Sequence, residues 1–333
     1  MAAENEWEGW AWGKEMDTAF ISSTCSDRHD VAGERQAAAQ ARVRELIKSS
    51  SEAGLREILR EIPLSDLDDG FFLGMAVAWA SGSGQDLGCL RALLDAGAPI
   101  DSPISEGYTA LSRAADGGDA ESIHALCSLG ANIETRDEAG RTPLMLAAAC
   151  ANEMAIFALL ELGASALGKD LAARTAVDML LSAGEWRPSL EQREADARCL
   201  AALMRAGGLC SRTASMSMMA QIAITGNAAM LAAATETGVV AVDDASKSGA
   251  TALMCCASHQ LSSLDECAKA LLELGARTDL ADNKGITALD YAMEGGNHVI
   301  ADLIRKAVAA REAFAISQAA GEPEPHPSRR MSL

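Results

Sequence analysis

Threonine and glycine residues recur in this chain at a constant interval of 33 residues. An interval of this length constrains the fold strongly, because each unit is one small supersecondary element that cannot bury its own hydrophobic face. Such units need at least three copies to form a stable stack, so the spacing predicts an elongated array of contacting neighbours. The two series are Thr109, Thr142 and Thr175, and Gly97, Gly130 and Gly163.

The most regular unit, residues 137–164, predicts a helix in each of its halves. Thr142 can cap a first helix, and Pro143 is tolerated in the first turn because the N–H that it lacks would be unpaired there. The alanines that follow keep this helix thin. The leucines of the second half supply apolar area, worth about 25 cal/mol per Å² buried. Gly163 can adopt the left-handed conformation that ends a helix.

Related segments begin the first helix of other units: GRTPLMLAA (140–148), GYTALSRAA (107–115), GATALMCCA (249–257) and GITALDYAM (285–293). With their period of 33 residues and a Thr-Pro-Leu start, they resemble the ankyrin-repeat family. The resemblance implies an all-α ankyrin-repeat solenoid of stacked helix-turn-helix units, joined by loops or short hairpins. It also implies that loop tips and the exposed side of the first helices form a concave binding face.

Counting outward from these segments divides the chain into five parts. Residues 1–33 form an acidic arm, 34–66 a helical cap that would be an eighth unit, and 67–307 about seven ankyrin repeats. Residues 308–320 extend the last helix, and the proline-rich residues 321–333 form a disordered tail. The repeats are expected at 67–101, 103–135, 136–168, 169–211, 212–244, 245–281 and 282–307.

Three repeats depart from the pattern. The first carries extra residues, ASGSGQ (80–85), which predict a mobile loop by their composition. The fourth has 44 residues rather than 33 between its helix-ending glycines, so 11 residues are inserted near 184–194. Trp186 in this insertion is either a local plug or a partner contact, because insertions in repeats emerge at loops. The fifth repeat, 212–244, is degenerate, with Ser217-Met218-Met219 in place of Thr-Pro-Leu. Its methionines are expected to adapt the core.

The arm holds Trp7, Trp10 and Trp12 among acidic residues. Three tryptophans so close together are costly to leave in water, so they dock either on the body of this chain or on a partner.

At the other end, Ser332 follows two arginines and resembles a site for basophilic kinases, and the last residues more weakly resemble a ligand of PDZ domains. Both matches are short and frequent.

The charge balance excludes several classes of partner. The 28 basic and 47 acidic residues give a net charge of −19, which repels nucleic acids and anionic lipid. No apolar run approaches the roughly 20 residues that span a bilayer, and no secretory signal starts the chain. The nine cysteines are scattered without a Cys-x-x-Cys pair, which is typical of reduced thiols in the cytosol or nucleus. We expect no nucleic-acid binding, no membrane insertion and a cytoplasmic or nuclear location.

No constellation for catalysis is visible. The five histidines lie in different units or tails, and no glycine-rich phosphate loop is present. Cys255, Cys256, His259 and Cys267 are metal-like in type, but their spacing matches no zinc pattern, and Cys256 occupies a position held by a packing alanine elsewhere. We therefore expect no enzyme, no cofactor and no metal.

Recognition of a protein remains, and the resemblance locates it on the concave face. Aromatic, arginine and methionine side chains are enriched at interface centres. The histidine that usually follows Thr-Pro-Leu in the family is absent from every unit, which removes hydrogen bonds that tie the loops. The candidate contacts are Tyr108, Ser112, Arg113, Arg141, Met145, Leu146, Arg174, Asp178, Lys247, Met254, Lys284, Ile286, Asp290 and Tyr291, with Trp186 and the tryptophan arm.

Three functions compete. The first is a scaffold or adaptor that binds a protein partner through the concave groove. The second is a regulatory or inhibitory subunit whose acidic surface masks a basic site on an enzyme or channel. The third, more distant, is an enzyme with a metal site at Cys255. The identity of the partner and the oligomeric state are left open.

Overall fold

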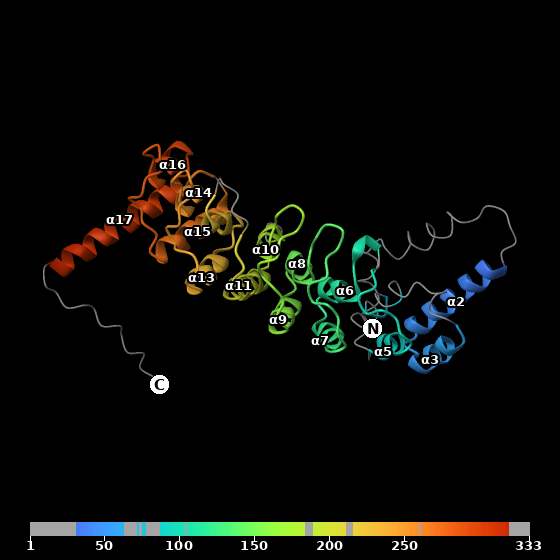
Figure 1. Ribbon diagram of the computed structural model, residues 1–333. Helices are drawn as coiled ribbons and strands as arrows, with labels where there is room; N and C mark the ends of the chain where they lie inside the picture. The colour runs from blue at the N-terminus through green and yellow to red at the C-terminus, as the bar shows by residue number, and fades with distance from the viewer. Residues whose placement is uncertain are drawn as a thin grey trace, which may run out of the picture.

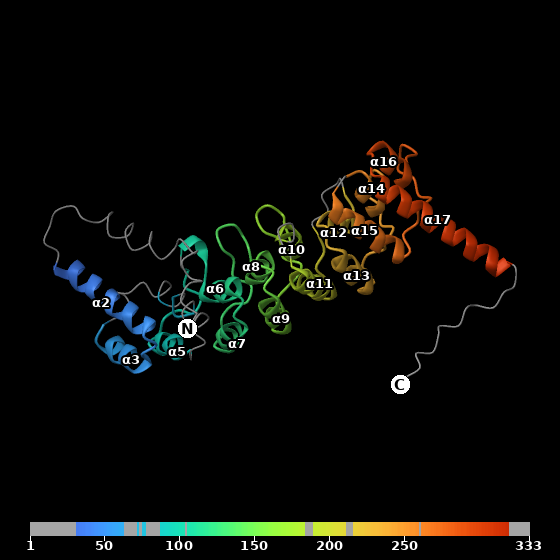
Figure 2. The same cartoon turned by 180° about the vertical axis from the view of Figure 1, so that it is seen from behind.

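The computed structural model describes residues 31–62, 72, 75–77, 87–103, 105–183, 189–210, 216–259 and 261–319. These residues form helices joined by turns, without a β-strand in the described ranges, and one isolated bridge joins Ala281 to Thr287. The helices stack into an elongated body with α2 (Val31–Lys48) near one end and α17 (His298–Ala319) at the other (Figures 1 and 2). The predicted all-α solenoid is confirmed.

From α6 onward, each unit in the described ranges contributes a first and a second helix, and α5 is the second helix of the unit before. The first helices are α6 (Ala110–Gly117), α8 (Pro143–Ala149), α10 (Ala176–Ala183), α12 (Met218–Ile224), α14 (Ala252–Ala257) and α16 (Ala288–Glu294). The second helices are α5 (Gly88–Asp95), α7 (Ala120–Ser128), α9 (Glu153–Glu161), α11 (Leu190–Arg205), α13 (Ala228–Glu236), α15 (Ser262–Glu273) and α17. The fifth, degenerate repeat therefore contains a helical pair, α12 and α13.

The helix ends follow from single residues. Thr142 Oγ1 accepts a hydrogen bond from the Met145 amide at 3.4 Å, so Thr142 caps α8 as predicted. Ser217 replaces the threonine of the degenerate repeat and caps α12 in the same way, because its hydroxyl accepts from the Ala220 amide at 3.2 Å. Gly163 follows α9 with a φ of 91°, the left-handed conformation predicted for it.

The two kinds of helix form two rows. Second helices pack on each other from α7 through α17. First helices pack in succession from α6 to α10 and again from α12 to α16, whereas α10 and α12 make little direct contact. Between those two the stack is continued mainly by α11, which packs extensively on α13. Residues 190–194 of the expected insertion form the first turns of α11, which is 16 residues long where α9 and α13 have 9.

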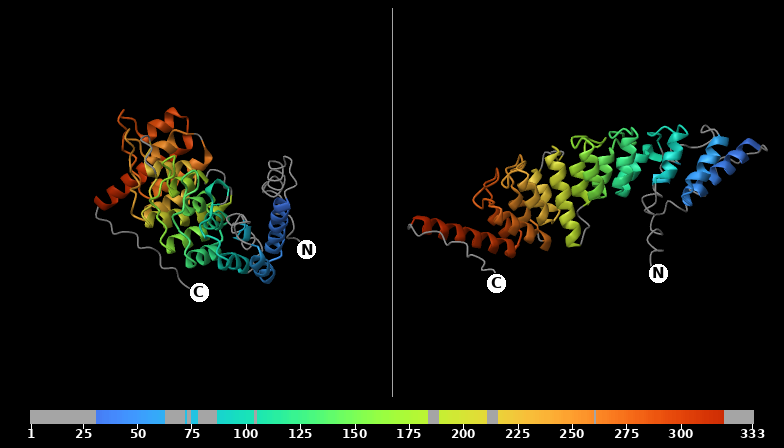
Figure 3. Two further views of the ribbon diagram at one scale, coloured as in Figure 1. Left: turned by 45° about the vertical axis from the view of Figure 1, so that its right-hand side comes forward. Right: turned by 90° about the horizontal axis from the view of Figure 1, so that it is seen from below.

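The ends of the stack are tied by polar contacts. At the amino-terminal end, α3 (Glu52–Glu61) packs on α5, and Arg56 forms an ion pair with Asp95 at 2.8 Å. At the other end, α17 projects beyond the stack (Figure 3), and the Arg311 guanidinium donates to the Ala276 carbonyl at 2.7 Å. None of the helices in the described part is long and apolar enough to span a membrane.

Candidate functional site

The loops that precede the first helices are joined to one another at their tips. We call the exposed tip residues Glu106, Glu138, Leu171, Lys247 and Lys284 the fingertips. Three backbone hydrogen bonds link successive loops: Glu138 N to Glu106 O at 3.0 Å, Leu171 N to Ala139 O at 3.0 Å, and Asn283 N to Ser248 O at 2.9 Å. Backbone pairing of this kind holds neighbouring tips in a defined order.

Three of these loops each contain a buried aspartate that forms hydrogen bonds within the loop. Asp137, Asp170 and Asp282 each lie five residues before the capping threonine of their unit, and each is at most 9% exposed. One carboxylate oxygen of each accepts the backbone N–H four residues further on, from Arg141 at 2.7 Å, Arg174 at 2.7 Å and Ile286 at 2.9 Å. These bonds tie each loop back on itself. The aspartates recur at a fixed offset from threonine, a signal that sequence reasoning missed.

The second oxygen of each aspartate binds a predicted contact residue. Arg141 Nε donates to Asp137 at 2.6 Å, and Arg174 Nε donates to Asp170 at 2.9 Å. Tyr291 uses its hydroxyl to donate to Asp282 at 2.8 Å. Three candidate contacts therefore hold their own loops in shape.

Arg141 also reaches the preceding loop. Its guanidinium donates to the Tyr108 hydroxyl at 3.1 Å and lies 5.7 Å from the centre of the Tyr108 ring. Hydrogen bonding and a cation–π contact thus join Tyr108 to the next unit. Both side chains are half-buried. The structure brings these two candidates together, as part of the loop framework.

The carboxylates of Asp178 and Asp290 serve local helix caps. Asp178 accepts from the Thr175 amide at 2.7 Å and from its hydroxyl at 2.9 Å. Asp290 makes the same two bonds with Thr287, at 2.9 Å and 2.6 Å. In return, the amide of each aspartate donates to the threonine hydroxyl at 3.3 Å. These reciprocal bonds are capping boxes, which satisfy N–H groups at the start of α10 and α16.

Four candidates were expected on an exposed helix face, and that expectation was wrong. Ser112, Met145, Leu146 and Met254 are at most 2% exposed. First helices such as α8 pack against first helices on both sides and against their own second helix, so most of their circumference is buried. These side chains belong to the core.

The remaining candidates differ in exposure. Lys247 and Lys284 are exposed, whereas Arg113 and Ile286 are half-buried. Arg113 lies 3.8 Å from Asp116. Trp186 and the arm with Trp7, Trp10 and Trp12 lie outside the described residues.

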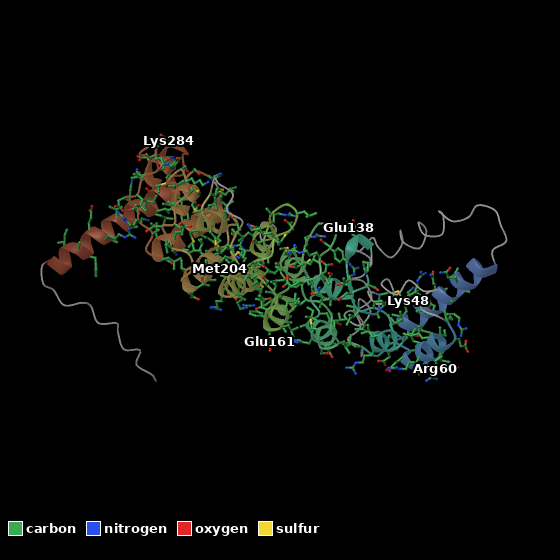
Figure 4. The ribbon with its side chains drawn as sticks, in the orientation of Figure 1. Lys48, Arg60, Glu138, Glu161, Met204 and Lys284 are labelled. Carbon is green, nitrogen blue, oxygen red and sulfur yellow. The ribbon has the colours of Figure 1, made fainter. Side chains whose placement is uncertain are left out.

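Three exposed fingertips were absent from the predicted set: Glu106, Glu138 and Leu171, the last of which is 81% exposed. In Figure 4, Glu138 and Lys284 lie far apart on the edge of the body that carries the loops, and Glu161 of α9 lies on the opposite edge. The signal that identifies these positions is their offset of three or four residues before the capping threonine. The fingertips therefore form a fingertip edge along the stack.

Asparagine side chains join neighbouring units on the side of the stack away from the loop tips. Asn152 Nδ2 donates to the Asp116 carbonyl at 2.6 Å, Asn227 Nδ2 to the Arg193 carbonyl at 3.0 Å, and Asn297 Nδ2 to the His259 carbonyl at 3.0 Å. Each bond reaches the preceding unit, so each helix pair is held to its neighbour on the side away from the tips.

Stability should fall in acid because of the loop aspartates. Hydrogen bonds from the Ile286 amide, then from Tyr291, lower the pKa of Asp282. Burial alone would raise the pKa of Asp170, but hydrogen bonds from Arg174 lower it overall. A carboxylate whose pKa is lower in the folded chain than in the unfolded chain, where it is about 3.9, stabilises the fold at pH values above the unfolded pKa. This stabilisation is lost as the pH falls through the folded-state pKa.

We therefore expect the urea midpoint to be constant between about pH 7 and 5 and to fall below about pH 4. Asp282→Asn should flatten the acid limb. An unchanged acid limb in that variant would show that the loop carboxylate does not contribute.

No group of three or more histidine, cysteine or acidic side chains is placed to hold a metal ion in the described ranges. His259 is exposed, and its Nδ1 lies 2.9 Å from the Ser258 hydroxyl and 3.0 Å from the Cys255 carbonyl. Cys256 and Cys267 are buried. The arrangement around Cys255 is that of packed thiols.

Buried thiols should react slowly. Burial raises the pKa of Cys210 and of Cys267 to about 12, and that of Cys256 further. Since the thiolate is the nucleophile, iodoacetamide at pH 8 should leave these three cysteines unmodified in the native chain and modify them in urea. Peptide mass spectrometry measures each site. Equal labelling in native and unfolded protein would contradict the packing described.

Comparisons with known proteins agree with this geometry. Residues 75–170 match the family model for ankyrin repeats in three copies. The human ASB11 ankyrin repeat domain has a similar fold, with 19% identity and a TM-score of 0.52 over 71% of this chain and 96% of that one. Residues 75–170 are therefore ankyrin repeats, as the segments at 107–115 and 140–148 predicted, and the described part of the chain has the ankyrin-repeat fold.

Two bacterial structures are also similar in part. An ankyrin repeat domain from Acinetobacter baumannii is 27% identical over 59% of this chain and 96% of that one, with a TM-score of 0.48. A chain from a complex of a predatory endopeptidase of Bdellovibrio bacteriovorus with an immunity protein is 22% identical over 61% and 98%, with a TM-score of 0.45. A search of curated protein sequences found no significant match.

Proposed function

We propose that this chain is a scaffold or adaptor that binds a protein partner along the fingertip edge and the adjoining concave side of the first helices. Ankyrin repeats are in general protein-interaction modules, and stacked repeats offer extended binding surfaces. The observation that carries the proposal is the fingertip edge itself. Its side chains are exposed, whereas the residues beneath them are bonded into the loops.

Rigid loops matter because ordering a mobile surface costs free energy on binding. Backbone bonds between tips and carboxylate bonds within loops supply this order before any partner arrives. The face is therefore preorganised. We also propose a reducing compartment, cytosolic or nuclear, since the cysteines that the structure describes are free thiols.

Affinity capture with the full chain tests the proposal. The test variant changes Glu138, Leu171 and Lys284 together to serine, because all three side chains are exposed. Lys284 donates to Asp282 only through its backbone N–H, at 2.9 Å, and serine retains that group. The matched control changes Met154 and Phe157 of α9 to serine, since both are exposed on the second-helix row. A partner should be lost from the fingertip variant and kept by the control. The reverse pattern would refute the proposal.

Arg141 and Tyr291 are unsuitable for this test. Their bonds to Asp137 and Asp282 shape the loops, so substituting them would change the surface and the stability of the fold together. Glu138 and Lys284 serve better, because a change there leaves the loop carboxylates paired.

The net charge of −19 favours a second candidate, a regulatory or inhibitory subunit that masks a basic site on an enzyme or channel. An interaction steered by opposite charges associates more slowly as salt rises. For a captured partner, a steep decrease in association rate between about 50 and 300 mM salt supports this candidate. A rate independent of salt supports the scaffold.

A further inference from the structure

The row of first helices is interrupted at one boundary between α6 and α16. α6, α8 and α10 pack in succession, and so do α12, α14 and α16, whereas α10 and α12 make little direct contact (Figure 2). This boundary divides the stack into an amino-terminal half, α6 to α11, and a carboxy-terminal half, α12 to α17. On the first-helix side, the two halves are joined only weakly by helix packing.

The row of second helices is continuous across the same boundary. α11 packs extensively on α13. Two polar contacts cross the boundary here, and both use Arg193 of α11. Its carbonyl accepts from Asn227 Nδ2 at 3.0 Å, and its guanidinium lies 3.8 Å from the carboxylate of Glu266 on α15. The two halves are thus joined along the side of the stack that lies away from the loop tips.

The helices next to the boundary are packed with methionine. Met179 of α10, Met204 of α11, and Met218 and Met219 of α12 are at most 9% exposed. A methionine side chain is unbranched and has three rotatable bonds, so it fills irregular spaces and adapts when its surroundings shift. Packing of this kind tolerates a change in the relative position of the helices better than a core of stiff, β-branched side chains does.

We propose that the boundary between α10 and α12 is a hinge, at which the two halves rotate about the α11–α13 contact while the buried methionines repack. Rotation of rigid bodies needs one side that stays joined and one side that opens, and the two rows of helices supply these sides. The rotation would change the curvature of the fingertip edge. It is a property of the chain alone, so its test needs no partner and leaves the proposed function standing whatever the outcome.

The size of the expected movement follows from the dimensions of the unit. A first helix of seven or eight residues and one helix–helix spacing place the loop tips roughly 20 Å from the α11–α13 contact. A rotation of about 15°, as in known rigid-body transitions, would therefore move the tips of one half relative to those of the other by about 5 Å.

Distances between spin labels test the hinge in the full chain. One pair of labels replaces Leu171 and Lys247, which lie in loops two units apart across the boundary. A matched pair replaces Glu106 and Leu171, in loops two units apart within the amino-terminal half, and a third pair replaces Lys247 and Lys306 within the carboxy-terminal half. All four positions are exposed, and the loop bonds at the tips use backbone atoms. Attachment through a ketone-bearing amino acid leaves the native cysteines unmodified.

Pulsed electron paramagnetic resonance gives the distribution of distances for each pair. We expect the distribution across the boundary to be about 5 Å broader than the distribution of either pair within a half. A distribution across the boundary as narrow as the other two would overturn the inference. Equal breadth in all three pairs would overturn it as well, because the motion would then belong to the loops.

Leucine substitutions test the role of the methionines. Met218→Leu with Met219→Leu keeps the side-chain volume in α12 but replaces flexible side chains with branched ones. The matched control is Met145→Leu with Met254→Leu, because both methionines are buried in first helices that pack closely on their neighbours. The distribution across the boundary should narrow toward that of the pairs within a half in the α12 variant and stay broad in the control, with circular dichroism showing that both fold. No narrowing in a folded α12 variant, or equal narrowing in both variants, would overturn a hinge that works by repacking of these methionines.

Discussion

Leu159→Ala should lower the free energy of unfolding by about 3 kcal/mol, because it removes a buried side chain and leaves a cavity. Leu159 is 0% exposed on α9, a helix that packs on α7, α8 and α11. Loss of packing in one unit also weakens its interfaces with both neighbours, since a solenoid is stabilised by nearest-neighbour contacts. Urea unfolding followed by circular dichroism measures the change.

Leu162→Ala is the matched control for that substitution. Leu162 follows α9 and is 38% exposed, so the same change of side chain should cost less than about 1 kcal/mol. Equal losses in the two variants would show that Leu159 is not packed as the structure describes.

Asp137→Ala should lower the free energy of unfolding by about 2 kcal/mol. Hydrogen bonds to charged groups contribute about 1.5–3 kcal/mol each, and part of this loss is offset because water can hydrate Arg141 once its partner is removed. The variant removes both bonds to Arg141, at 2.7 Å and 2.6 Å, from a carboxylate that is buried. The loop of Glu138 should become mobile as a result. Urea unfolding measures the stability, and hydrogen exchange measures the loop.

The neighbouring residue supplies the control. Glu138 is exposed, and Glu138→Ala should change stability by less than about 0.5 kcal/mol. If Asp137→Ala were as mild as Glu138→Ala, the carboxylate would not organise the loop, and the preorganised edge would lack its physical basis.

Much of the fold could be predicted because local residues determine it. The period of 33, a capping hydroxyl such as that of Thr142, and helix-ending glycines such as Gly163 act within one unit, and their effects are visible in the sequence. The path of the stack past α10 could not be predicted in the same way. It depends on the packing of α11 on α13, a contact between units.

The candidate surface was predicted less well, for a physical reason. Sequence offsets placed Met145 and Met254 on the first helices, but which side of a helix is exposed depends on how closely its neighbours pack. Arg141 and Arg174 have the residue type of interface anchors, yet the aspartates beneath them hold both side chains. The exposed Leu171 follows one such aspartate directly.

Photo-crosslinking tests the central claim most directly. A benzophenone amino acid replaces Leu171 at the fingertip edge in one protein and Phe157 on α9 in a second, both of which are exposed positions. Mass spectrometry then identifies crosslinks to the captured partner. Crosslinks from position 171 and none from position 157 are the predicted result. A partner that crosslinks from position 157 and never from position 171 would contradict binding at the fingertip edge.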